Sequence, residues 1–573
     1  MGDAAKVLVR PEQIYGVAFH EGVFWVGDRS FAEIPWKSLS NTFLYAIDEL
    51  HLEALLSDAA SRGFMILDGA LSDRRGLRGF SVAIGAWGYG GVVECRTVDA
   101  WAIDADAARL PPEEALRIQQ ILRDLCIELN QEPTTFRPTA LRFLSGLYRR
   151  LGLPREFDGA PAPVLPPAVA LLARRAHVGG PIVHARTTLA PFVSLDRDRA
   201  YGEAMLLELP SGDPTEVDLG TRPLLRWSPS SLMGSMGIAE ATVKLEMGPF
   251  LPLLPITRYH HVPGKTRTLY PTGTLRGFWV LAELAALEQT GRGRVEQLHR
   301  VVLFGKARPL APVVRYLRSI ESIVKGIKMK RLEHMLYGQC AKTLHLTRFS
   351  TTRGDVRPLP ADLLDARTLD RLTSRVEVQR FHRRGVKSPP REVPLHMVSG
   401  KLSESATFGS MDRPDRSAFI TAQNRIAMMS IIDQLDAALK PSRSGAYVGR
   451  VYVDGLDIEA QASEVPRLQG VSVRAVGTTM SIYRANAYIQ HRADGSTVLE
   501  SGGHPVEDPE DLVHVLDQMA EDREDAGPFA GGRVWPFVQH VEDPRLLENQ
   551  KSEPMHLDLG LVDQLGFSSN VTL

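Results

Sequence analysis

Acidic residues follow two apolar, strand-like segments that lie far apart in the chain. In PFVSLDRDRAYGEAM, Asp196 ends an apolar run and Tyr201 follows five residues later. In VGRVYVDGLDIEA, Asp454 and Asp457 flank a glycine-containing hairpin tip. Carboxylates on neighbouring strands can hold two Mg²⁺ ions, or Mn²⁺ in their place, that clamp the attacking and leaving oxygens of a phosphoryl transfer. The pattern makes Asp196, Asp454 and Asp457 candidate metal ligands of a phosphoryl-transfer site.

A basic segment, RYLRSIESIVKGIKMKRLEHMLYG, lies between the two acidic segments and is predicted to form one helix over 312–337. Leu317, Ile320, Val324, Ile327 and Leu332 make an apolar stripe along it. Its lysines and arginines point elsewhere, and a triphosphate needs such cations. Runs of this kind are usually solvated helix faces. Lys330, seven residues before Tyr337, is one of the candidate phosphate contacts in this run.

Composition places these segments in a soluble protein of several domains. The chain has 573 residues, which predicts three or four modules, and its formal net charge of −1 gives no global sign of a nucleic-acid partner. Any such binding must come from local patches. Three widely spaced cysteines form neither a disulfide framework nor a metal motif, which indicates a reducing cytoplasm. No apolar run has the length of a signal peptide core or a membrane span, so we expect no membrane partner.

The elements that must position the acidic residues fall on both sides of a proline-rich stretch. An α/β domain is expected over 1–150, a linker over 151–170 and a polar tail over 541–573. Before the linker, the periodicity predicts strands at 13–36, 64–68 and 80–84 and helices at 112–130 and 138–151. After it, we expect a strand at 191–195, helices at 274–289 and 418–439, and a hairpin at 446–460.

The order of these segments resembles the protein-primed branch of the family B DNA polymerases. Asp196 and Tyr201 resemble the family's motif A, Lys330 with Tyr337-Gly338 resembles motif B, and YVD at 452–454 resembles the start of motif C. Three further segments match: RAHVGG at 175–180 resembles a template-contacting Y-x-G-G motif, FITAQNR at 419–425 the helix before motif C, and YRANAYIQ at 483–490 a primer-terminus motif.

The resemblance implies an α/β multidomain protein with a ribonuclease H-like N-terminal domain followed by a right-hand palm, fingers and thumb. Palm and fingers would cover 171–470, and the thumb or primer-strand region 471–540. It also implies a template-directed DNA polymerase that adds a dNMP to a primer 3′-OH and uses DNA template and primer, dNTPs and a terminal protein. Such an enzyme would act in a bacterial cytoplasm and be encoded by a phage or a plasmid-like mobile element.

Roles for single residues follow from the same resemblance. Asp196 and Asp454 would lie at the metal site. The nucleotide would contact Tyr201, which rejects a 2′-hydroxyl, together with Lys330, Tyr337 and Gly338. Nucleic acid would contact a larger set: His177, Gly179, Gly180, Arg484 and Tyr488, with Arg380, Arg383 and Arg384 of a basic segment at 371–391 on the downstream duplex. Gly179-Gly180 fits an ordinary turn equally well.

Several positions depart from the family pattern. Leu456 stands where the family has its second motif C carboxylate, and Asp457 comes one residue later. A one-residue shift turns a strand side chain to the other face, so Asp457 replaces the missing ligand only if the tip bulges at Gly455. The N-terminal domain lacks an Asp-x-Glu on its first strand, so proofreading is expected to be absent. These departures leave two functions open: a divergent active polymerase, and an inactive polymerase-like protein that binds nucleic acid or a partner.

Overall fold

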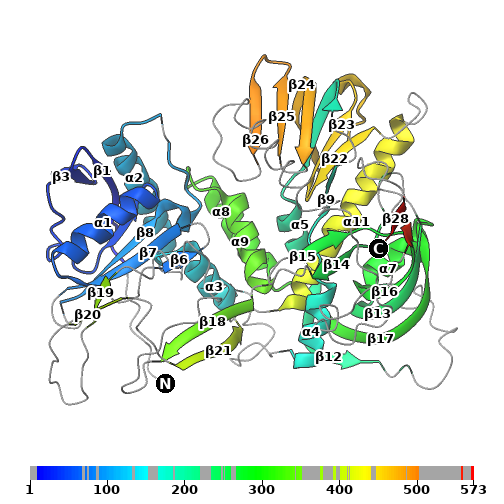
Figure 1. The fold of residues 1–573 in the computed structure, drawn as a ribbon, viewed down its shortest axis with the longest axis horizontal. Helices are drawn as coiled ribbons and strands as arrows, with labels where there is room; N and C mark the ends of the chain where they lie inside the picture. The colour runs from blue at the N-terminus through cyan, green and yellow to red at the C-terminus, as the bar shows by residue number, and fades with distance from the viewer. Residues whose placement is uncertain are drawn as a thin grey trace. The chain divides into compact units, whose positions relative to one another are not determined.

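Figure 1 shows a computed structural model of the chain. It divides into two compact units, Met1–Ala341 with Arg413–Leu573, and Lys342–Asp412. The structure describes residues 9–66, 71–73, 76–84, 90–106, 108–131, 136–151, 165–184, 188–217, 219, 234–246, 250, 252–259, 266–341, 343–350, 375–378, 391–394, 401–408, 411, 413–439, 447–484, 487–501, 556–558 and 570–572.

The N-terminal part of the larger unit is built on a mixed sheet. Its strands are β1 Ile14–His20, β2 Val23–Val26, β3 Arg29–Phe31, β4 Phe43–Ala46, β5 Met65–Ile66, β6 Leu71–Asp73, β7 Gly76–Ala83 and β8 Val92–Thr97. They follow the order β3-β2-β1-β4-β8-β7-β5, with β6 beside β7. The first three strands form an antiparallel meander, and β4 and β8 continue it in parallel.

The helices of this part are α1 Glu49–Ser61, α2 Pro111–Gln131 and α3 Ala140–Leu151, of which α1 and α2 contact the sheet. The carboxylate of Asp48 accepts a hydrogen bond from the amide of His51 at 3.0 Å, which caps the first turn of α1. Leu52 and Leu55 of α1 are buried in a core with Phe80 and Val93 of the sheet. The helices predicted over 112–130 and 138–151 are confirmed.

A second sheet carries both acidic segments, and we call it the Asp196 sheet. Its strands are β9 Ile182–His184, β10 Thr188–Leu189, β11 Phe192–Arg197, β22 Val448–Tyr452, β23 Gly455–Glu459, β24 Val471–Arg484, β25 Ala487–Arg492 and β26 Thr497–Ser501. Their order is β26-β25-β24-β11-β23-β22-β9, with β10 beside β24 (Figure 1). The predicted strand at 191–195 and hairpin at 446–460 are both confirmed.

The two faces of the Asp196 sheet differ because strand side chains alternate. Val193 and Leu195 of β11 and Leu456 of β23 belong to a large apolar core. Ser194, Asp196, Gly455 and Asp457 alternate with those residues and therefore lie on the opposite face. The apolar face fixes the register, and that register decides which polar residues can meet on the other side.

The core beneath the Asp196 sheet is completed by a third sheet and by helices. The third sheet consists of β12 Leu209–Glu216, β13 Met236–Leu245, β16 Gly273–Val280 and β17 Gly293–Ala307, and a separate hairpin joins β14 Ile256–Tyr259 to β15 Thr266–Leu269. The helices of this region are α4 Pro167–Ala176, α5 Ala200–Leu206, α7 Leu281–Gln289, α8 Ala311–Glu321, α9 Met329–Ala341 and α11 Pro414–Leu439. Helix α11 contacts α4, α5 and α9, so it joins segments that are far apart in the sequence.

Two predicted helices differ from the structure. The helix predicted over 274–289 begins only at Leu281, because the residues before it form β16. Leu275, Gly277 and Trp279 are buried, whereas Thr274, Arg276 and Phe278 between them are less so, which is the two-residue period of a strand. The single helix predicted over 312–337 is two helices, α8 and α9, with Gly326 at φ 97° between them. Glycine adopts that conformation readily, and Gly326 lies in the turn between the end of α8 at Glu321 and the start of α9 at Met329.

The smaller unit, Lys342–Asp412, contains two described hairpins. One pairs β18 Thr343–Ser350 with β21 Lys401–Phe408, and the other pairs β19 Arg375–Val378 with β20 Arg391–Pro394. The basic residues proposed to contact duplex, Arg380, Arg383 and Arg384, lie outside the described residues. Within the described part of the chain, none of the helices has the length and hydropathy to cross a bilayer.

Candidate active site

The pairing of β11 with β23 brings two of the predicted acidic residues together. Asp196 lies opposite Gly455, and Tyr452 closes the hairpin by pairing with Gly455, so Val453 and Asp454 form its tip. The amide of Arg197 donates a hydrogen bond of 2.9 Å to the carbonyl of Asp454. That bond ties the end of the first acidic segment to the tip of the second.

Lys330 lies between the two carboxylates. Its Nζ atom is 3.3 Å from Oδ2 of Asp196 and 3.9 Å from Oδ2 of Asp454. The Oδ2 atom of Asp454 is buried and accepts no hydrogen bond. Burial raises the pKa of Asp454, Lys330 opposes that shift, and the charge of Asp196 adds to it. The site is therefore short of positive charge even with Lys330 in place.

A buried ionic network holds the helix that carries Lys330. Glu333 of α9 is fully buried and pairs with Arg199 at 2.9 Å and with Arg318 of α8 at 3.0 Å. Arg199 follows β11 and has a positive φ of 47°. A Cβ atom at Gly202 would lie 1.9 Å from Oε2 of Glu333, so a side chain there would displace the Glu333 carboxylate from its present ion pairs. The end of β11 and helix α9 are thus held in one arrangement.

Aromatic rings surround the same place. The rings of Tyr201 and Tyr337 have centroids 4.6 Å apart, and those of Tyr201 and His334 are 5.2 Å apart. Nε2 of His177 shares a hydrogen bond of 2.8 Å with the hydroxyl of Tyr337. Burial lowers the pKa of His177 to about 4, and burial raises the pKa of Tyr201 to about 12. All of these rings are uncharged near neutral pH, so they form a stacking surface rather than a charged one.

The glycine-containing segment after α4 packs against the hairpin tip. A Cβ atom at Gly180 would lie 2.9 Å from Cα of Val453, so a side chain there would displace the tip. The amide of Val453 donates a hydrogen bond of 2.6 Å to the carbonyl of Pro181. At Gly179 an added Cβ would meet nothing within 4 Å. Gly180 is therefore required by packing, whereas Gly179 is free to face a ligand.

Arg425, from the segment FITAQNR, holds the backbone of the segment after α4 in place. Its guanidinium pairs with Glu283 at 2.7 Å and donates hydrogen bonds to the carbonyls of Val178 and Gly179, the latter at 3.2 Å. Both Arg425 and Glu283 are 1% exposed. Such a buried pair stays in place only because each partner neutralises the other. Five of the six sequence segments therefore meet around Asp196 and Asp454.

Asp457 lies apart from this pair. It is 2% exposed, pairs with Arg450 and accepts a hydrogen bond from the hydroxyl of Ser194. The tip does not bulge at Gly455; the register shift of this hairpin lies between Val448 and Arg450. Asp457 does point to the same face as Asp196, but two residues, or about 7 Å, further along the strand pair. Its environment favours a structural role over the predicted role as metal ligand.

The sixth segment, YRANAYIQ, lies beside Asp457. Gln490 of β25 donates a hydrogen bond of 3.0 Å to the hydroxyl of Ser194, and the guanidinium of Arg450 lies 4.0 Å above the ring of Tyr488. Arg484 ends β24, and its side chain is outside the described set. An added Cβ at Gly338 would meet nothing within 4 Å, so packing does not require that glycine.

Asp196 and Asp454 are suited to bind a divalent cation. The unpartnered, buried Oδ2 atom of Asp454 lacks a positive partner within hydrogen-bond distance. Mg²⁺ is commonly held by only one or two carboxylates, with substrate phosphates and water completing its shell. Where the structure describes the chain, there is no group of three or more histidine, cysteine or acidic side chains that could hold a metal without such help.

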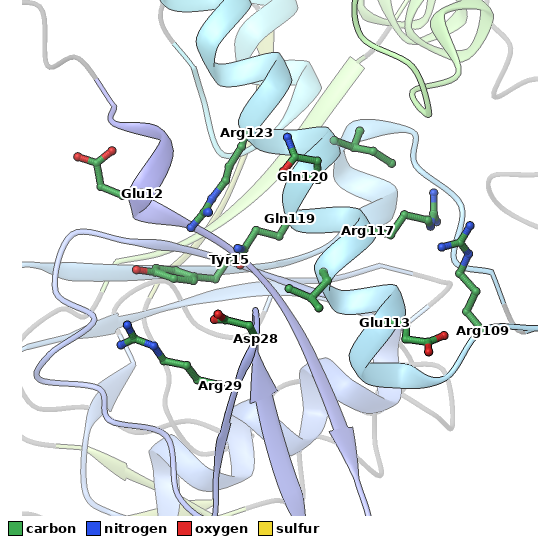
Figure 2. Close-up of a pocket in the computed structure, with 12 residues that line it drawn as sticks. Glu12, Tyr15, Asp28, Arg29, Arg109, Glu113, Arg117, Gln119, Gln120 and Arg123 are labelled. Atoms are coloured by element: carbon green, nitrogen blue, oxygen red, sulfur yellow. The ribbon is translucent and has the colours of Figure 1, made fainter.

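A separate hollow of about 870 Å³ lies in the N-terminal part, between α2 and the β1–β3 meander (Figure 2). It shares no lining residue with the site around Asp196. Its lining carries both charges: Arg29, Arg109, Arg117, Arg123, Glu12, Asp28 and Glu113. Arg109 and Arg117 pair with acids beside them, and Arg123 contacts the ring of Tyr15 at 5.6 Å and the carbonyl of Ile14. These mixed and engaged charges favour no one class of ligand.

Sequence reasoning missed three residues that shape the site. Nothing in the sequence singled out Glu333 or Arg450. His334 of α9 is the third of these residues. Its Nε2 atom is buried without a hydrogen-bond partner, and burial lowers its pKa. The only signal in the sequence was that Glu333 and His334 lie between Lys330 and Tyr337.

Comparison of the sequence with family models and with curated proteins gives no match. Solved structures of Phi29 DNA polymerase are similar in fold. Its orthorhombic crystal form has a TM-score of 0.52 at 14% sequence identity and covers 86% of this chain and 90% of that one. Its ternary complex with primer-template DNA and incoming nucleotide has a TM-score of 0.53 at 12% identity, over 86% and 92% of the two chains. A binary complex with primer-template DNA gives 0.52 at 12% identity over 98% of both. The polymerase resemblance predicted from six segments is confirmed at the level of the fold.

Proposed function

We propose that this chain is a template-directed DNA polymerase that adds a dNMP to a primer 3′-OH. The observation that carries the proposal is the meeting of Asp196 and Asp454 beside Lys330 and the ring of Tyr201. These two carboxylates lack enough positive charge beside them, and the aromatic rings next to them are uncharged. This arrangement suits a nucleoside triphosphate with its divalent ions. DNA template, primer and dNTPs are the partners this proposal requires.

The residues divide the work as follows. Asp196 and Asp454 would hold Mg²⁺, which supplies positive charge to the reacting phosphate when it is bound. Lys330 would bind the triphosphate and meet charge that develops on the leaving group. Tyr201 and Tyr337 would line the nucleotide pocket, with Tyr201 beneath the sugar. His177 would hold the hydroxyl of Tyr337, and Gly179 would leave room for a template phosphate.

The N-terminal part supports the proposal as a ribonuclease H-like domain without proofreading. An antiparallel meander continued by two parallel strands is the strand order of that fold. Its first strand, β1, carries no acidic residue, and Asp124 on α2 is exposed and accepts a hydrogen bond from Gln120. Initiation on a terminal protein, and a phage or plasmid replicon in a bacterial cytoplasm, rest on the sequence resemblance alone.

Primer extension tests the proposal. With Mg²⁺ or Mn²⁺, wild-type protein should extend a primed template, and Asp196→Asn should lower the rate at least ~10²–10³-fold, since it removes a group that positions transition-state charge. Asp198→Asn is the matched control, because Asp198 lies two residues away and hydrogen-bonds Ser472 instead.

A second function, nucleic-acid binding without catalysis, is favoured by the position of Asp457. Arg450 and Ser194 already bind that carboxylate, which leaves Asp196 and Asp454, of the three predicted ligands, to hold the metal. Wild-type protein that binds primer-template DNA but extends no primer with either metal would support this second function and overturn the first.

A further inference from the structure

The residues directly opposite Asp196 are Gly455 on strand β23 and Ser472 on strand β24, and the backbone pairing sets both. In the register of β11 with β23, Ser194 faces Asp457, Leu195 faces Leu456 and Asp196 faces Gly455. Directly opposed residues of an antiparallel pair carry side chains on the same face, with Cβ atoms about 4.5–5.5 Å apart. A carboxylate at position 455 would therefore stand beside that of Asp196.

Position 455 has room for a side chain. A Cβ atom built there meets the carbonyl of Tyr452 at 3.4 Å, the carbonyl of Leu195 at 3.7 Å and Oδ1 of Asp196 at 3.9 Å, all ordinary contacts. Gly455 is not among the residues with positive φ, so an L-amino acid can adopt its backbone conformation. Glycine at this position is not required by the fold.

Position 456, where the motif alignment puts the missing carboxylate, lies on the other face. Leu456 is 2% exposed and belongs to the apolar core with Leu195 and Val451. A carboxylate there would be buried among apolar side chains with no partner, which is strongly unfavourable. The structure thus separates two positions that the sequence alone would treat as alternatives.

Lys330 supplies the cation that this incomplete acidic pair attracts. Its side chain is 41% exposed, whereas those of Asp196 and Asp454 are 18% and 17% exposed. The ammonium group therefore reaches in from solvent to the more buried carboxylates. A bound divalent ion and Lys330 would compete for the same two oxygens, because opposite charges at this range strongly favour one another.

We infer that Gly455 limits the affinity of this site for divalent cations and that Lys330 balances the two carboxylates until a metal-bound nucleotide displaces it. The inference rests on the metal-binding part of the proposed function. It makes position 455 a determinant of metal affinity, and it gives Lys330 a role before the nucleotide arrives.

The test is the affinity of the full-length protein for Mn²⁺ alone, followed by electron paramagnetic resonance of the free ion at neutral pH. Gly455→Asp should bind Mn²⁺ about tenfold more tightly than wild type, since added carboxylate charge strengthens such sites. Gly455→Asn, which has the same shape without the charge, should bind like wild type. Lys330→Gln should bind several-fold more tightly, because the competing ammonium is gone.

Leu456→Asp distinguishes the structural register from the motif alignment. It should lower the melting temperature without tightening Mn²⁺ binding. The inference is overturned if folded Gly455→Asp binds no more tightly than Gly455→Asn, or if Leu456→Asp remains stable and binds more tightly. Should Gly455→Asp fail to fold, the half-exposed Lys330→Gln still decides, and unchanged affinity there overturns the inference.

Primer extension separates this inference from the proposed function. If Gly455→Asp gains Mn²⁺ affinity but no variant extends a primer, the inference stands and the polymerase proposal fails. If wild type extends primers but Gly455→Asp gains no affinity, the polymerase proposal stands and the inference fails.

Discussion

Two aspartates three residues apart on one hairpin, Asp454 and Asp457, lie in opposite environments. Asp457 is buried, and both of its oxygens have partners, Arg450 and Ser194. Asp454 has a buried oxygen without a hydrogen bond, and burial raises its pKa. A buried carboxylate with hydrogen-bond and ion-pair partners stabilises the fold. One that lacks these partners lowers stability and can instead bind a ligand. The difference supports the proposal that Asp454, and not Asp457, binds the metal.

Removing Asp457 should give the largest change in stability. Asp457→Ala leaves Arg450 buried without a partner and should lower the free energy of unfolding by ~3–5 kcal/mol, measured by urea denaturation. The double variant Asp457→Ala/Arg450→Met should recover most of that loss, because it removes both charges. Mn²⁺ affinity should remain that of wild type; a folded Asp457→Ala that loses Mn²⁺ binding would restore Asp457 as a metal ligand.

Neutralising Asp454 should have a smaller effect of the opposite sign. Asp454→Asn should raise the free energy of unfolding at pH 7 by ~0.5–2 kcal/mol and weaken Mn²⁺ binding. The folded state raises the pKa of Asp454, so the protonated carboxyl is the form that favours folding. Its contribution to stability is full below the unfolded pKa and is lost as the pH rises through the folded pKa.

The advantage of Asp454→Asn over wild type should therefore shrink as the pH falls through the raised pKa of Asp454. Urea denaturation of both proteins over a pH series measures this. If the difference in free energy of unfolding stays constant with pH, burial does not raise the pKa of Asp454 in the folded protein.

Neutralising a solvent-exposed carboxylate that forms ion pairs should change the free energy of unfolding least of the three. Asp104 pairs with Lys328 and, at 3.6 Å, with Arg331, and the side chains of Lys328 and Asp104 are 60% and 50% exposed. Asp104→Asn should lower the free energy of unfolding by less than ~1 kcal/mol, and 1 M salt should abolish the difference. A loss as large as that of Asp457→Ala would show that burial is not what separates these carboxylates.

Much of the site follows from local sequence patterns. The strand before Asp196, the hairpin around Asp454 and the helix containing FITAQNR were predicted because apolar periodicity and turn residues act over a few neighbours. The choice of Lys330 rested on its spacing to Tyr337, and the structure places it between Asp196 and Asp454. The break at Gly326 and the strand β16 were missed. A segment rich in apolar residues fits both the helical repeat and the two-residue strand repeat, and tertiary contacts determine which one forms.

What the sequence by itself determined is the set of residue types and their order: acidic strand, basic helix, acidic hairpin. What only the tertiary structure decided is the register between β11 and β23, which makes Gly455 rather than Leu456 the neighbour of Asp196. The physical reason is that register depends on which face is buried against elements distant in the chain, here the core containing Leu195 and Leu456. The same core places Asp457 beside Arg450, and so it separates the structural aspartate from the pair that we propose binds metal.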